Sequence, residues 1–185
     1  RTVQEAGYRR QEASSPVHYH NEWCKDAPGL AEPITVELHW SFVQEGVSAM
    51  DVEALWREAE PLGGFRHIRV LTPEATFYTL CLHGASHQME SVKHVLDLLH
   101  MLCEHGRRID LVAVLGRASR DQTRNRVKAA LAVLYTLYPE LEQRKPSPVP
   151  LPLLGWPGLD TDGRASRFSR FCYSLRMMDT PRDRL

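Results

Sequence analysis

Residues 34–40 read ITVELHW, an alternation of apolar and polar side chains that is typical of a β-strand. Successive side chains of a strand point to opposite faces, so Glu37 and His39 share one face. The apolar residues, among them Leu38 and Trp40, share the other face, which is predicted to pack against a core. The polar face then presents a carboxylate beside an imidazole at the centre of the strand.

A second strand is predicted just before this one. Residues 16–23 (PVHYHNEW) also alternate, and residues 25–33 (KDAPGLAEP) carry the Pro and Gly that mark a loop. A β-hairpin is the economical interpretation. Such a hairpin could place His18 and His20 opposite Glu37, although the register that decides the pairing is left open by the sequence.

Short elements follow. Ser48, with Asp51 three residues later, is typical of a helix start, and residues 51–60 are amphipathic. Residues 65–71 (FRHIRVL) form a third predicted strand. The first part of the chain is therefore predicted to hold a small mixed or antiparallel sheet within residues 1–71.

From residue 72 onward the predicted structure is helical. The sequence Thr72-Pro73-Glu74 is a helix start with proline at the first helical position. Apolar residues recur at helical spacing over 74–104, and Gly84 predicts a break between residues 84 and 91. Further helices are predicted over 109–118, 121–138 and 164–179, with a Pro-rich connector over 139–163. The predicted fold class is α+β, with a helical domain over 72–185.

Composition narrows the functional classes. Lys plus Arg and Asp plus Glu each number 23, so no overall field favours nucleic acid or an anionic membrane. No stretch approaches the roughly 20 apolar residues of a membrane span, and no signal peptide is recognisable. The four cysteines lack any Cys-x-x-Cys pair, which predicts free thiols and a cytoplasmic location.

Two interpretations of Glu37 are possible. A carboxylate on a rigid strand is what Mg²⁺ needs in nucleotidyl transfer, whereas an edge strand carries acids on its solvent face without any function. A third alternative combines His18, His20, Glu37 and His39 into an iron or zinc site of the kind found in β-barrels. The chain has too few predicted strands to close a barrel.

The sequence HGASH places His83 and His87 one helical turn apart, a spacing that can hold zinc. The Glu that follows the first His in the His-Glu-x-x-His protease motif is missing. On an unbroken helix, Glu90, His94 and Asp97 would extend the pair into one polar stripe. A metal site and a polar helix face with hydrogen-bonded histidines both stay open.

The order of these motifs resembles a known family. AGYRR, VHYH, VELHWSF, LTPE, LCLHGASH, SVKHVLDLLHML and SLRMMDTPRDRL follow one another as in the uncharacterised, minimal-type nucleotidyltransferases related to the DNA polymerase β superfamily. The resemblance covers nearly the whole chain. It implies a partial nucleotidyltransferase core, and transfer of a nucleotidyl group from an NTP to an unknown hydroxyl-bearing acceptor. Two Mg²⁺ ions would be held by an Asp-x-Asp pair and a later acid.

By position, Glu37 corresponds to that later acid, as a catalytic residue and metal ligand. The resemblance further implies cleft residues in both halves of the chain: His39, Trp40, His83, His87, Lys93 and Asp97. The family's Asp-x-Asp strand lies upstream of AGYRR, and Asp26 alone precedes Glu37 here. We therefore expect a segment of a longer nucleotidyltransferase or, alternatively, a degenerate member that binds a nucleotide or a protein without catalysis.

Overall fold

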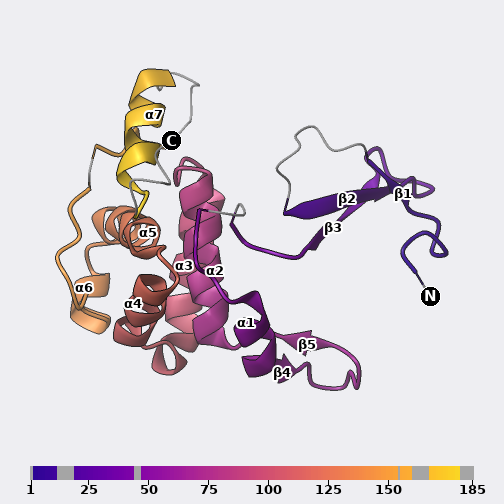
Figure 1. The fold of residues 1–185 in the computed structure, drawn as a ribbon, viewed down its shortest axis with the longest axis horizontal. Coiled ribbons are helices and arrows are strands. Elements are labelled where there is room, and N and C mark those ends of the chain that lie inside the picture. Colours follow the sequence, from indigo (N-terminus) through magenta and orange to yellow (C-terminus); the bar gives the residue numbers. More distant parts are fainter. Residues whose placement is uncertain (1, 12–18, 44–46, 154, 160–166, 180–185) are drawn as a thin grey trace. The chain divides into compact units, whose positions relative to one another are not determined.

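The computed structural model describes residues 2–11, 19–43, 47–153, 155–159 and 167–179. It confirms the predicted α+β class, since small antiparallel sheets are followed by helices (Figure 1). The chain divides into two compact units, residues 1–45 and residues 46–185. The domain boundary expected between residues 71 and 72 stays a prediction.

The first unit is built on the predicted hairpin. Strands β2 (His20–Lys25) and β3 (Ile34–His39) pair antiparallel, and β1 (Arg9–Arg10) pairs with the other edge of β2. The loop between β2 and β3 contains Gly29 with φ of 85°, a conformation that favours glycine. Residues 16–18 of the predicted strand, His18 included, lie outside the described residues.

The apolar face of β3 is not the buried core that the alternation predicted. Ile34, Leu38 and Trp40 are 41%, 43% and 53% exposed. The described residues of the first unit form strands and turns, and they supply no helix that could cover this face. A two-residue periodicity identifies the two faces of a strand, but it does not say what covers either of them.

The second unit begins with helix α1 (Val52–Glu58). Its N-cap is Asp51, whose Oδ1 accepts a hydrogen bond of 2.9 Å from the backbone nitrogen of Ala54, so the prediction of Ser48 as the cap is wrong. Strands β4 (Glu60–Pro61) and β5 (Arg69–Val70) follow as a separate two-stranded sheet. The third predicted strand is therefore shorter than expected and does not join the hairpin.

The predicted helices of the second unit are present with small shifts at their ends. They are α2 (Pro73–Ser86), α3 (Val92–His105), α4 (Leu111–Arg120), α5 (Arg124–Leu137) and α7 (Arg167–Arg176), and residues 164–166 of the last predicted helix lie outside the described residues. The 3-10 helix η1 (Gly106–Arg108) and the short helix α6 (Leu141–Arg144) were not predicted, and α6 interrupts the predicted irregular connector. Thr72 caps α2 as predicted, because its hydroxyl accepts from the nitrogen of Ala75 at 3.2 Å. The break between α2 and α3 is also confirmed.

Helices α2 and α5 form the centre of this unit, and α3 and α4 pack beside them (Figure 1). Phe77 and Leu82 of α2 and Leu131 and Leu134 of α5 have no exposed surface. Burying such side chains contributes about 1.5–3 kcal/mol each before chain entropy is counted. The apolar pattern of residues 74–138 thus produces the core on which the polar residues of α2 and α3 are mounted.

Helix α2 ends in a Schellman motif. The nitrogen of Met89 donates to the carbonyl of Gly84 at 2.7 Å, and the nitrogen of Gln88 donates to the carbonyl of Ala85 at 2.9 Å. Gln88 takes the left-handed conformation of this motif with φ of 57°, a position that glycine usually occupies. The indole nitrogen of Trp156 donates to the Gln88 carbonyl at 3.1 Å and ties the turn to the connector after α6.

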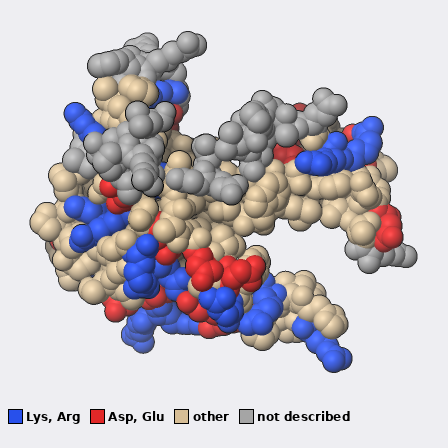
Figure 2. All heavy atoms as spheres, in the orientation of Figure 1, with Lys and Arg blue, Asp and Glu red and all other residues tan. Residues whose placement is uncertain are grey.

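Charges of both signs lie side by side on the face shown in Figure 2, in keeping with the balanced composition. Arg117 of α4 pairs with Glu58 at the end of α1, and Arg108 pairs with Glu60 at 2.6 Å. In the described part of the chain, no helix is long and apolar enough to cross a membrane.

Candidate functional site

The polar face of the hairpin carries two acids and two histidines in register. Glu22 of β2 is the direct partner of Glu37 of β3, and His20 is the direct partner of His39. Directly opposed residues of an antiparallel pair project on the same side with Cβ atoms about 5 Å apart. The hairpin therefore gathers all four side chains on one face.

Glu37 and His39 are hydrogen-bonded to each other. Nε2 of His39 lies 2.9 Å from Oε2 of Glu37, and the two side chains are 30% and 50% exposed for His39 and Glu37 respectively. Across the hairpin, the ring of His20 stacks on that of His39 with centroids 4.8 Å apart. The imidazole pair fixes the orientation of one Glu37 oxygen and leaves the carboxylate accessible to solvent.

Glu22 was not predicted as a site residue. Glu22 lies two residues after His20 in the sequence, just as His39 lies two residues after Glu37. The alternation of side chains along the strand therefore already placed Glu22 and His20 on one face. The register His20↔His39 was the missing information, because a slip of one residue would have turned Glu22 to the other face. The three-stranded sheet of this unit does not close a barrel, which removes the fold basis for the barrel-type metal site.

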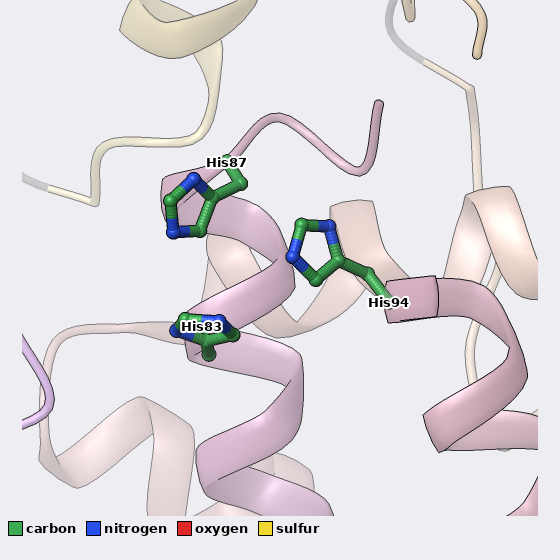
Figure 3. A group of neighbouring side chains, drawn as sticks. All are labelled: His83, His87 and His94. Carbon is green, nitrogen blue, oxygen red and sulfur yellow. The ribbon is translucent and has the colours of Figure 1, made fainter. Parts of the chain in front are cut away.

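Three histidines of the second unit come together at the α2–α3 turn (Figure 3). The ligand atoms of His83, His87 and His94 all lie within 4.8 Å of one another. The rings of His87 and His94 are stacked with centroids 5.1 Å apart, and the ring of His83 meets both edge-on. Among the described residues, this is the one group of three or more His, Cys, Asp or Glu side chains close enough to share a metal ion.

His94 meets His83 and His87 through a reversal of the chain that the sequence did not predict. On an unbroken helix His94 would follow the pair along a stripe, but the helix ends at Ser86 and a new one begins at Val92. The Schellman turn reverses the chain, so α3 packs on α2 and His94 faces the pair from the first turn of α3. His94 was thus predicted as part of a stripe and is found in a cluster of rings.

Burial, followed by the nearby His83 and His87 rings and the Lys93 ammonium, lowers the pKa of His94, and Asp97 acts in the opposite direction. The neutral imidazole is consequently the favoured form at neutral pH. A neutral imidazole is also the form that binds a metal ion.

Lys93 and Asp97, the other predicted cleft residues of α3, form an ion pair. Nζ of Lys93 lies 2.5 Å from Oδ2 of Asp97 at the i,i+4 spacing that stabilises exposed helices. The Lys93 side chain is 72% exposed and that of Asp97 is 32% exposed. In this arrangement the Lys93 ammonium group is paired with the carboxylate of Asp97 on its own helix.

A pocket lies elsewhere in the second unit. It has a volume of about 630 Å³ and is lined by the end of α3, η1 and the α6 region, including Leu102, Arg107, Leu141 and Arg144. None of the predicted site residues lines it. The chemistry-bearing groups are therefore on surfaces of the hairpin and of the α2–α3 turn.

Comparison with known families decides the relationship of the chain. A family model described as uncharacterised nucleotidyltransferase matches residues 2–139, which is more than half of the 185 residues. The chain belongs to this family. No curated protein and no solved structure matches it. The match to the uncharacterised nucleotidyltransferase family spans the hairpin with Glu37 and the helices with the three histidines.

Proposed function

We propose that this member of the uncharacterised nucleotidyltransferase family takes part in metal-dependent nucleotidyl transfer from an NTP to a hydroxyl-bearing acceptor, with Glu37 as a metal carboxylate. Family membership supports the reaction class. The position of Glu37 supports its role, because the residue sits within a paired strand, is half-exposed and is held by His39. Rigid placement of an oxygen ligand is what positioning by a metal requires.

The residues present fit a magnesium ion. Mg²⁺ sites commonly use one or two protein carboxylates and complete the coordination with water and substrate phosphates. Glu22 and Glu37 are opposed on one face and can supply those two carboxylates. Like charges directly opposed on a sheet repel each other, so a bound cation would also stabilise the hairpin.

When bound, Mg²⁺ would neutralise charge on the phosphates and favour deprotonation of the acceptor hydroxyl. The residues of the chain itself would hold the ion and orient its carboxylate ligands. His39 donates to one oxygen of Glu37 and orients the carboxylate, which is half-exposed. Glu22 would add a second carboxylate to the site from the neighbouring strand.

Two further residues, Trp40 of the first unit and Lys93 of the second, have side chains suited to contacts with a nucleotide. Trp40 is exposed immediately after β3 and offers a flat surface on which a base can stack. Lys93 is suited to a phosphate contact, but it must first leave Asp97.

The experiment is a transfer assay with the protein produced from its complete reading frame. NTPs labelled at the α-phosphate are incubated with Mg²⁺ and separate acceptor pools of RNA, protein and small hydroxyl metabolites; transfer of the label to the acceptor and release of unlabelled pyrophosphate are both followed. We expect release to fall on the order of 100-fold in Glu37→Gln, as is typical when a group that stabilises transition-state charge is lost. Glu32→Gln is the matched control, because Glu32 is an exposed acid in the β2–β3 loop. Equal loss in both variants would refute the role of Glu37.

A different outcome identifies the alternative function. If Mg²⁺ and an NTP bind to the wild-type protein but no pyrophosphate is released with any acceptor pool, the chain acts as a nucleotide-binding module. Loss of that binding in Glu37→Gln but not in Glu32→Gln would then assign Glu37 to binding alone.

A further inference from the structure

We propose that His83, His87 and His94 form a three-histidine site for a zinc-class transition-metal ion, which links α2 to α3. The site is separate from the carboxylates of the hairpin. Its ligands are imidazoles, which suit zinc, copper, nickel or iron, whereas Mg²⁺ prefers oxygen ligands. Nucleotidyl transfer with Mg²⁺ does not require this additional zinc-class ion.

The distances support a site that closes on an ion. In a tetrahedral zinc site with bonds of about 2.0–2.1 Å, the ligand nitrogens are about 3.3 Å apart. The three ligand atoms lie within 4.8 Å of one another, so they need to approach by at most about 1.5 Å. His83 and His87 are exposed and their rings can turn by this amount without displacing core residues.

The backbone brings the ligands together without the metal. The four-residue step places His83 and His87 on one face of α2. The third ligand depends on the Schellman turn, which Trp156 holds through the Gln88 carbonyl. Met89 is completely buried at this turn and packs over Gly84. Two helices fixed to the same core therefore supply the three imidazoles.

One ligand has an unsatisfied polar atom. Nδ1 of His94 is buried and has no hydrogen-bond partner among the described residues. In Figure 3 the ring nitrogen of His94 that faces the other two rings is Nε2. A hydrogen carried on Nδ1 would leave the lone pair of Nε2 to bind the ion.

The exposure of the cluster defines the kind of site. Three protein ligands leave the fourth tetrahedral position for water or an exchangeable ligand, as in zinc sites of the open type. The exposed rings of His83 and His87 place that position at the surface. The ion would stabilise the α2–α3 turn and remain accessible to small anions in solution.

The test measures metal binding by the full chain after treatment with a chelator. Co²⁺ is titrated and the visible absorption of tetrahedral Co²⁺ is recorded, then Zn²⁺ is used to displace it and bound zinc is measured by mass spectrometry. We expect one zinc per chain. His94→Ala should weaken zinc binding by more than about 10-fold, because losing only an outer partner of a zinc ligand already costs about 10-fold and this variant loses a ligand itself. His100→Ala is the matched control, because His100 is exposed on the same helix outside the cluster.

Two outcomes overturn the proposal: wild-type zinc affinity no tighter than that of His94→Ala, or equal losses in His94→Ala and His100→Ala. If His94→Ala fails to fold, His87→Ala replaces it, because His87 is exposed and its truncation leaves the core intact. Zinc should also raise the thermal midpoint of the wild-type protein and not that of the variant. Glu37→Gln should leave zinc content unchanged, so failure here is distinguishable from failure of the nucleotidyl-transfer proposal.

Discussion

Gly84 of α2 lies directly beneath Met89, so closely that a Cβ atom at residue 84 would overlap the Met89 sulfur. The same Cβ would lie 3.4 Å from Cβ of His94. Met89 is fully buried and cannot move into solvent without losing its packing. The absence of a side chain at Gly84 is therefore what allows the turn to fold back over α2 and bring His94 to the histidine pair.

Gly84→Ala should destabilise the second unit. Overpacking typically costs about 1–3 kcal/mol, and the better helix propensity of alanine offsets up to about 1 kcal/mol of that. Urea unfolding measures the difference. Gly116→Ala in α4 is the control, because its Cβ would meet only the far end of Arg120 at 3.8 Å. The control should be neutral or slightly stabilising; a loss as large as that of Gly84→Ala would contradict the packing argument.

Tyr78 connects α2 to the turn between α4 and α5. Its hydroxyl lies 2.8 Å from Oδ2 of Asp121, to which it can donate, and 2.7 Å from Oγ1 of Thr123. Either hydroxyl can be the donor in the second bond, because the Thr123 hydroxyl also lies 3.4 Å from the Ala118 carbonyl oxygen that can accept its hydrogen. Burial raises the pKa of Tyr78 far above its usual value, which keeps the phenol hydrogen in place.

We predict that Tyr78→Phe costs about 1–3 kcal/mol of unfolding free energy, because it leaves the buried Thr123 hydroxyl and the Asp121 carboxylate with one partner fewer. Urea unfolding of Tyr78→Phe, Thr123→Val and the double variant forms a thermodynamic cycle. Non-additivity on the order of 1 kcal/mol is expected for groups in contact. Strict additivity would mean that the two hydroxyls do not interact in solution.

The pH dependence of stability should carry a signature of His94. Its pKa is lowered in the folded protein, first by burial and then by His83, His87 and Lys93, against the opposing charge of Asp97. Below its ordinary value of about 6.5, the unfolded chain takes up a proton that folded His94 resists. Its contribution is therefore complete above that pH and is lost as the pH falls towards the folded value.

Urea unfolding in a chelator-containing buffer between about pH 5 and pH 7.5 tests this expectation. His94→Gln should flatten the decline of stability on acidification, and His100→Gln should leave it as in the wild-type protein. An identical pH profile for all three proteins would show that His94 titrates normally in the folded state.

Local patterns in the sequence predicted much of this fold. The hairpin, the Thr72 cap, the helical second half and the break after residue 84 all follow from periodicity, proline and capping residues. The cap of α1 was misplaced because Ser48 and Asp51 are both good cap residues, and only the Asp51 hydrogen bond to Ala54 distinguishes them.

The candidate sites needed information that lies outside local patterns. Glu22 joins Glu37 through the register of β2 and β3, which depends on pairing between two segments. His94 joins the histidine pair through a left-handed Gln88, a residue that does not ordinarily mark a Schellman turn. The exposed face of β3 depends on what covers it, which alternation cannot specify.

The most direct test of the central claim is the binding of Mn²⁺, a spectroscopic substitute for Mg²⁺, in the presence of an NTP. Electron paramagnetic resonance of free Mn²⁺ is followed in wild-type protein, Glu37→Gln and the control Glu32→Gln, each produced from the complete reading frame and chelated beforehand. We predict that Glu37→Gln weakens Mn²⁺–NTP binding by about 10-fold or more, corresponding to at least 1.4 kcal/mol. The control should match the wild-type protein. Equal Mn²⁺ affinity in all three proteins would contradict the assignment of Glu37 as a metal carboxylate.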